Sequence, residues 1–163
     1  MASATRTRRE VPVQTQLHEP VGSPFPRSPA ERRTASRIVL IDEDEENRQL
    51  VSEVVTRAGH EVVGHAADGA LGVQVTLAER PDLVITSWRM PVMDGVETTR
   101  RLRTACPNVA VVALCSLSDR LLCDEFLRAG ADACIEKRDI HGLPAAMLDV
   151  QRARRVTGPP SAT

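Results

Sequence analysis

The chain has 163 residues, of which 21 are basic and 22 acidic, so its formal net charge is -1. Hydrophobic residues at 42% and charged residues at 26% are typical of a folded globular domain, and the length suits one domain with tails. The near-zero charge and an aromatic content of 2% argue against a nucleic-acid-binding protein, which needs a basic field and often stacking rings. No apolar run is long enough to span a membrane.

The expected location is the cytoplasm. No secretory signal is visible near the N-terminus. The four cysteines lack the C-x-x-C spacing of a zinc site, and they are typical of a reducing compartment.

The two ends of the chain differ in composition from its middle. Residues 1–36 hold five of the 11 prolines and six arginines but no apolar periodicity, so they are predicted to form a disordered arm. A docking peptide around Phe25 is the alternative interpretation of this arm. Residues 156–163 are predicted to be a disordered tail, which leaves residues 37–155 as the folded domain.

Within this domain, short apolar runs alternate with segments of helical period. The runs are typical of buried strands and span residues 37–41, 61–65, 83–87, 109–115 and 133–136. Each run precedes an apolar stripe of helical spacing. The stripes comprise Leu50, Val51, Val54, Val55 and Ala58, then Leu71, Val75 and Ala78, then Val96, Thr99, Leu102 and Cys106, then Leu122, Phe126 and Ala129, and finally Leu143, Met147 and Val150. This alternation predicts an α/β fold with a parallel sheet that helices cover on both faces.

Polar side chains and a cysteine gather where the predicted strands end. Asp42 and Glu43 follow the first run, Ser87 ends the third, Cys115 ends the fourth, and Lys137 follows the fifth. Ligands of such sheets bind at the carboxyl edge, so the chemistry is expected there.

Three motifs occur in order along the chain. They are the acidic turn that begins at Asp42, Met90-Pro91-Val92-Met93-Asp94-Gly95, and Gly130-Ala131-Asp132-Ala133 followed by Lys137. Over residues 37–150 the chain therefore resembles the receiver domain of two-component response regulators. The resemblance implies a doubly wound, flavodoxin-like sheet of five parallel strands in the order 2-1-3-4-5.

The resemblance also implies a site. In that family an aspartate takes a phosphoryl group from a phosphohistidine, acidic neighbours hold Mg²⁺, and a lysine and a hydroxyl contact the phosphoryl group. Asp42 and Glu43 match the acidic pair, and Lys137 matches the lysine. Three other positions depart from the pattern: Ser87 stands at the phosphoacceptor position, Cys115 at the hydroxyl position, and Cys134 at the position of an aromatic switch residue.

These departures predict an atypical receiver, or pseudo-receiver. A serine hydroxyl is neutral and needs a base to attack, and its presence removes one negative charge from the metal pocket. Only a weak Mg²⁺ site on Asp42 and Glu43 is expected to remain, and an alternative role for these two acids is to cap the following helix. Lys137 is expected to pair with one of them.

The sequence predicts a stand-alone receiver module without enzymatic activity, in two-component or phosphorelay signalling. It would bind a histidine kinase or another regulator, independently of phosphorylation, through the face formed by its fourth helix, fifth strand and fifth helix. Small-molecule sensing in the pocket and residual phosphoacceptor chemistry at Ser87 are the alternatives.

The cysteines allow two interpretations. Cys115 and Cys134 end adjacent strands, so they are either a redox pair or, as the composition favours, small buried core residues. Cys106 and Cys123 are expected to pack on helices.

Overall fold

The computed structural model describes residues 35–116 and 120–158 of the chain. The helices and strands alternate as predicted, and a 3-10 helix, η1, follows the last strand. In chain order they are β1 (Arg37–Ile41), α2 (Glu45–Arg57), β2 (Glu61–Ala66), α3 (Gly69–Glu79), β3 (Leu83–Ser87), α4 (Gly95–Ala105), β4 (Ala110–Cys115), α5 (Arg120–Arg128), β5 (Ala133–Glu136), η1 (Lys137–Gly142) and α6 (Leu143–Thr157).

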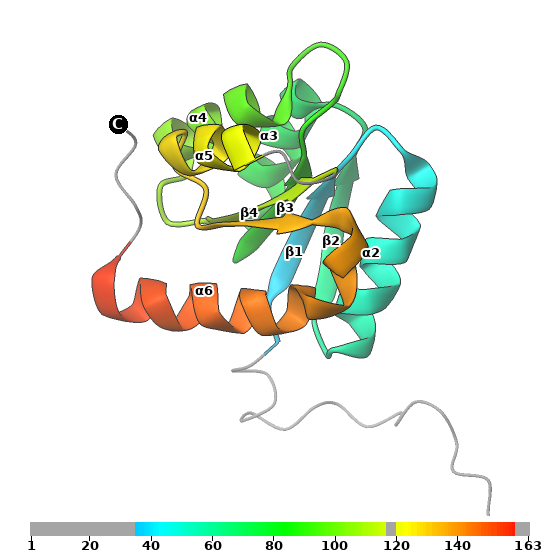
Figure 1. Ribbon diagram of the computed structural model, residues 1–163, viewed down its shortest axis with the longest axis vertical. Coiled ribbons are helices and arrows are strands. Elements are labelled where there is room, and N and C mark those ends of the chain that lie inside the picture. The colour runs from blue at the N-terminus through cyan, green and yellow to red at the C-terminus, as the bar shows by residue number, and fades with distance from the viewer. Residues whose placement is uncertain (1–34, 117–119, 159–163) are drawn as a thin grey trace, which may run out of the picture.

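The five strands form one parallel sheet in the order β2-β1-β3-β4-β5, which confirms the predicted fold class. Helices α2 and α6 cover one face of the sheet, and α3, α4 and α5 cover the other (Figure 1). All carboxyl ends of the strands meet at one edge, because every strand pair is parallel.

Alternate residues of each strand enter two separate cores. The core under α3, α4 and α5 includes the buried side chains of Val39, Ile41, Val111, Ala113, Leu102 and Phe126. The core under α2 and α6 includes Ile38, Leu40, Leu83, Ile85, Val112, Leu143 and Met147. This alternation follows from the period of two in a strand, and it means that a residue's place in its strand decides which helices it touches.

The buried face of α3 differs from the predicted one. The predicted stripe is wrong at Leu71, which is 42% exposed, and at the exposed Ala78, whereas Val75 packs against the core as predicted. The residues that the helix buries fully are Gly69, Gly72 and Thr76. The reason is a close helix–strand contact: a Cβ atom on Gly72 would lie 2.4 Å from Cδ1 of Ile41, so only glycine permits that approach.

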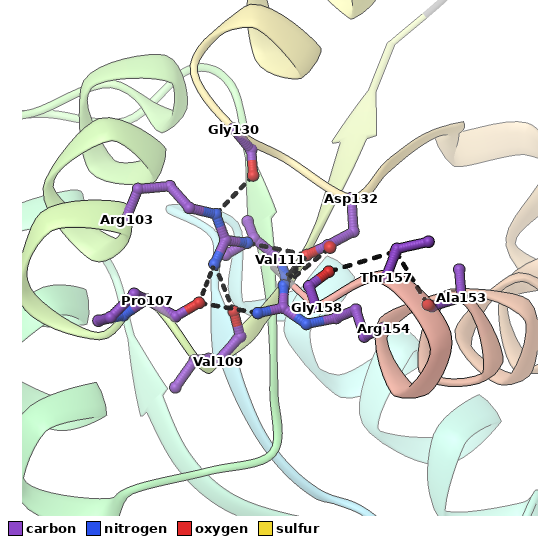
Figure 2. Close-up of polar contacts among 10 residues, drawn as sticks. All are labelled: Arg103, Pro107, Val109, Val111, Gly130, Asp132, Ala153, Arg154, Thr157 and Gly158. Atoms are coloured by element: carbon purple, nitrogen blue, oxygen red, sulfur yellow. Dashed lines mark hydrogen bonds and ion pairs between the residues drawn. The ribbon is translucent and has the colours of Figure 1, made fainter. Parts of the chain in front are cut away.

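A buried ionic cluster joins α4, α6 and the segment before β5 (Figure 2). One oxygen of Asp132, Oδ2, lies 2.8 Å from Nη2 of Arg103 and 2.7 Å from Nη1 of Arg154, and it accepts the backbone N–H of Val111 at 2.7 Å. Burial lowers the pKa of Arg103, whose Nε donates to the carbonyl of Gly130 at 2.6 Å. The Gly130-Ala131-Asp132 motif is therefore structural, and it lies at the amino end of β5, opposite the edge where the chemistry is expected.

Most of the predicted arm lies outside the described residues, as does the Phe25 docking peptide within it. Ser36, which the sequence assigns to the arm, is buried, and its backbone N–H donates to Nδ1 of His60 at 3.1 Å. The predicted tail begins in the last turn of α6, and residues 159–163 of it are not described. Within residues 35–116 and 120–158, no helix combines the length and apolar character needed to cross a membrane.

Candidate functional site

Asp42 is the centre of the carboxyl edge. It directly follows β1 and is 5% exposed. Its Oδ2 accepts hydrogen bonds from the hydroxyl of Ser87 and from Nζ of Lys137, the latter at 2.8 Å. Its Oδ1 accepts the backbone N–H of Asp44 at 3.0 Å. The ion pair predicted for Lys137 is thus confirmed, with Asp42 as its partner.

The register of the sheet explains why these residues meet. Ile41 of β1 pairs with Thr86 of β3, so the next residue on each strand, Asp42 and Ser87, lies at the same height. Lys137 begins η1 directly after β5, and its long side chain reaches back across the edge to Asp42.

The N-cap of α2 is neither Asp42 nor Glu43, the two acids for which capping was the alternative role. Asp44 is the N-cap, and its Oδ1 accepts the backbone N–H groups of Glu46 and Asn47 at 2.9 and 3.3 Å. The alternative that Asp42 and Glu43 cap this helix is therefore wrong. Asp42 faces inward to Lys137 instead, and its backbone carbonyl accepts a hydrogen bond from Arg48.

A pocket of about 360 Å³ opens above Asp42. Its lining carries both signs of charge and consists of Asp42, Glu43, Asp44, Asn47, Trp88, Arg89, Leu114, Ser116 and Lys137. Trp88 is partly buried there, and the guanidinium of Arg89 lies 5.2 Å from the centre of the Trp88 ring, which is a cation–π distance. Ser87 is 2% exposed and is not part of this lining.

The pocket fits Mg²⁺ only in part. Carboxylate oxygens are the ligands that Mg²⁺ prefers, and Asp42, Glu43 and Asp44 supply them. However, both oxygens of Asp42 already accept hydrogen bonds from the protein, and a cation beside Oδ2 would compete with the ammonium group of Lys137. The weak Mg²⁺ site therefore stays a prediction, and no chemical step is derived through it.

The two cysteines at the expected switch positions do not line this pocket. Cys115 and Cys134 belong to the core under α3, α4 and α5, where Cys134 forms a disulfide with Cys123 of α5. Cys106 and Cys123 pack against this core as predicted, but the disulfide of Cys123 was not predicted. A stripe of helical period identifies the buried side of α5 but not which strand residue lies opposite Cys123, so no sequence pattern indicated this pair.

The sequence also did not identify Ser116 as a hydroxyl of the pocket. Sequence reasoning placed Cys115 at the hydroxyl position, but the alternation of β4 directs Cys115 into the core and leaves Ser116 in the pocket lining. Ser116 supplies a hydroxyl to the pocket that Lys137 also lines.

Comparison with known proteins identifies the family. The model of the response regulator receiver domain matches residues 38–147. The chain belongs to the response regulator receiver family. Among solved structures, this receiver is similar to the signal receiver domain of the putative response regulator NarL from Mycobacterium tuberculosis, with a TM-score of 0.66, 26% identity, and coverage of 74% of this chain and 98% of that one.

Curated relatives place the receiver in two-component signalling. It is 39% identical over 103 residues to a two-component response regulator of Oryza sativa subsp. japonica, which covers 61% of this chain and 81% of the relative. It is 27% identical over 101 residues to the chemotaxis protein CheY of Thermotoga maritima, covering 62% and 84%. A protein-glutamate methylesterase/protein-glutamine glutaminase of Hahella chejuensis is 33% identical over 120 residues, or 72% of this chain, but the chain spans only 34% of that relative's length.

Proposed function

We propose that this receiver domain signals by binding a protein partner without forming an acyl phosphate. The observation that carries the proposal is the contact of the Ser87 hydroxyl with Asp42, at the end of β3, where the resemblance to receivers expects a nucleophilic carboxylate. A serine hydroxyl cannot form the acyl phosphate that an aspartate forms, since it has no carboxylate oxygen to accept the phosphoryl group.

Residual phosphoacceptor chemistry at Ser87 is the weaker alternative. Asp42 accepts a hydrogen bond from the Ser87 hydroxyl, which is the geometry that a general base requires. The same carboxylate oxygen also accepts a hydrogen bond from the ammonium group of Lys137, however, so the Ser87 hydroxyl shares that oxygen with a second donor. In addition, Ser87 is 2% exposed, so a phosphodonor cannot approach it without rearrangement of the pocket.

The charge of the pocket supports the same conclusion. Asp42, Glu43 and Lys137 sum to -1, whereas a further carboxylate at residue 87 would make the sum -2. Near a protein surface, two unit charges 4 Å apart interact with an energy of about 4 kcal/mol, before competition from solvent is counted. The pocket therefore attracts a divalent cation less strongly than the same pocket with a carboxylate at residue 87, and a bound cation is what would neutralise a phosphoryl group.

The proposed partner surface is the face of α5, β5 and α6, and the partner is a histidine kinase or another regulator. Helix α5 exposes Leu121 and Leu127, which are 76% and 47% accessible, and α6 exposes Leu148 at 44%. Helices α5 and α6 lie on opposite faces of the sheet and flank its edge strand β5, so these leucines are the exposed apolar side chains that the proposed surface would use. No enzymatic activity is assigned to the domain.

The test compares the proteins captured by the full-length chain and by two variants. Leu121→Asp places a charge on the proposed face, and Val92→Asp changes an apolar residue that is 87% exposed on the loop after β3. The partner should bind the wild type and Val92→Asp but not Leu121→Asp, and acetyl phosphate with Mg²⁺ should change the captured amount by less than about twofold. Capture that requires the phosphodonor, or that survives Leu121→Asp, would contradict the proposal.

Small-molecule sensing is the second candidate, favoured by the 360 Å³ pocket with its aromatic and charged lining. A thermal-shift screen distinguishes it, because a ligand that binds the folded state raises the melting temperature. Sensing requires that Trp88→Ala abolish such a shift, since Trp88 forms part of the pocket wall.

A further inference from the structure

We propose that Cys115, Cys123 and Cys134 form a thiol–disulfide exchange site whose redox state controls how firmly α5 is held against β5. The site takes dithiols and disulfides, either small molecules or cysteine pairs of other proteins. The exchange chemistry is independent of the function proposed above, and only its effect on partner binding rests on that function.

Three elements bring the sulfur atoms together. Cys115 ends β4, Cys123 lies in α5, and Cys134 lies in β5, and the three sulfurs are all within 4.8 Å of one another. The disulfide joins Cys123 to Cys134. The sulfur of Cys115 lies 2.6 Å from that of Cys134 and 3.6 Å from that of Cys123, so it contacts both members of the bond.

The surroundings of this cluster favour neutral sulfur chemistry. Leu122 and Phe126 of α5 are 4% and 0% exposed, and they belong to the same apolar core as Cys115. Three metal-bound thiolates would bring three negative charges into this core, and a divalent cation would neutralise only two of them. A disulfide and a pair of thiols are both neutral, so the cluster can change between these two states without burying a charge.

Access to the cluster is uneven. Cys123 and Cys134 are partly exposed, whereas Cys115 is 1% exposed. An external dithiol can therefore reach the disulfide: one of its thiolates attacks the sulfur of Cys123, and Cys134 leaves as a thiolate and takes up a proton. The second thiol of the reagent then displaces Cys123. The products are two protein thiols and one oxidised reagent.

The buried third sulfur adds an internal step that needs no external oxidant. The thiolate of Cys115 attacks the sulfur of Cys134, the Cys123–Cys134 bond breaks, and a Cys115–Cys134 bond forms. The proton that Cys115 loses is taken up by Cys123. The cross-link then joins β4 to β5, and α5 is no longer held covalently.

Release of α5 changes the proposed partner surface. The Cys123–Cys134 bond closes a short loop, with a sequence separation of 11, and it ties α5 to a strand of the central sheet. Leu121 and Leu127 of that surface lie on the same helix, on either side of Cys123. Opening the bond gives α5 more freedom, which alters the position of both leucines without any phosphoryl transfer.

The experiment uses full-length chain carrying Cys106→Ser, which leaves only the three clustered cysteines. Trypsin cleaves after Arg120 and Arg128, which places these cysteines on three separate peptides. The oxidised protein is quenched in acid, denatured, alkylated and mapped without reduction. The alkyl label should be divided between Cys115 and Cys123, with a measurable share on each. A label found only on Cys115 would overturn the internal exchange.

Amide hydrogen exchange measures the release of α5. Reduction with dithiothreitol should speed exchange in α5 at least about tenfold, while β1 and β3 stay protected. In the Cys123→Ser variant, the amides of α5 should exchange as fast as in the reduced wild type, both with and without dithiothreitol. The single variant Cys106→Ser should behave as the wild type, because burial raises the pKa of the Cys106 thiol and its sulfur is not in the cluster.

Two results would overturn the proposal as a whole. One is an α5 exchange rate that is the same before and after reduction. The other is one tightly held zinc or copper ion per purified chain that is lost in Cys115→Ser, which would make the cluster a metal site instead. Neither result depends on whether Leu121 binds a partner, so failure of this inference is distinguishable from failure of the proposed function.

Discussion

The hydroxyl of Ser87 and the ammonium group of Lys137 both donate to one oxygen of Asp42. Each of these side chains has an ordinary structural role, since the arrangement neutralises a carboxylate that is 5% exposed. The same arrangement defines the proposed function, because it places a neutral hydroxyl where a receiver needs a nucleophilic carboxylate.

The change Ser87→Asp tests this assignment of Ser87. A carboxylate at residue 87 would lie beside Asp42 and compete for Lys137, and the added negative charge should raise Mg²⁺ affinity about tenfold or more. Trp88 lines the same pocket, so its fluorescence during Mg²⁺ titration reports binding. Identical titrations of the wild type and the variant would mean that residue 87 is not at the acceptor position.

Asp132 is expected to be the most costly single ionic residue to remove. Asp132→Ala leaves the buried Arg103 and the partly covered Arg154 without their carboxylate, and breaking a buried ion pair costs about 3–5 kcal/mol. Urea unfolding measures this loss. The matched control is Asp149→Ala, because Asp149 is 78% exposed and lies 3.9 Å from Arg152, so its removal should change the unfolding free energy by less than about 0.5 kcal/mol.

At the scale of elements, the sequence predicted β1, β3 and β5 with their observed ends, because short β-branched and apolar runs bounded by turn residues have few other interpretations. It failed where a contact between elements decides the outcome. The inward face of α3 follows from the close approach of Gly72 to Ile41, and the Cys123–Cys134 bond follows from how α5 lies on β5. Neither contact leaves a periodic signal in the chain.

The α3 contact yields a test of its own. Gly72→Ala should improve helix propensity by about 1 kcal/mol, but its new Cβ would meet Ile41 at 2.4 Å. Overpacking of this kind costs about 1–3 kcal/mol, so the variant should unfold at a lower urea concentration. Gly142→Ala is the control, since no atom lies within 4 Å of its Cβ position. If Gly72→Ala is as stable as this control, the close packing of α3 on β1 is not rigid.

The sequence predicted which residues gather at the site better than it predicted which of them contact one another. A parallel sheet brings its carboxyl ends together, so Asp42, Ser87 and Lys137 could be grouped before the fold was known. Which acid would pair with Lys137, and which would cap α2, depends on the direction of single side chains. Asp42 and Asp44 differ in this respect although they are two residues apart.

At the scale of the whole molecule, Ser36 is part of the folded domain, although the sequence assigns it to the arm. Ser36 is buried, and its hydroxyl, carbonyl and N–H bind Gln151, Glu61 and His60. Removal of residues 1–34 should therefore change the melting temperature by less than about 2 °C, because their composition does not favour a packed core.

Removal of residues 1–36 should lower the melting temperature further, by several degrees, since a loss of about 1 kcal/mol corresponds to about 4 °C in a domain of this size. Differential scanning calorimetry of the two truncations measures the difference. A large drop already on removal of residues 1–34 would show that the arm packs on the domain.

The most direct test of a phosphorylation-independent receiver is the intact mass of the full-length chain after incubation with acetyl phosphate and Mg²⁺, read beside Ser87→Asp. The wild type should keep its mass, since no carboxylate stands at residue 87. Ser87→Asp should gain one hydroxylamine-labile phosphoryl group on a fraction of the molecules, because Lys137 is in place but its ammonium group is already paired with Asp42. A phosphoryl adduct on the wild-type chain, whether labile to hydroxylamine or stable in acid, would contradict the account.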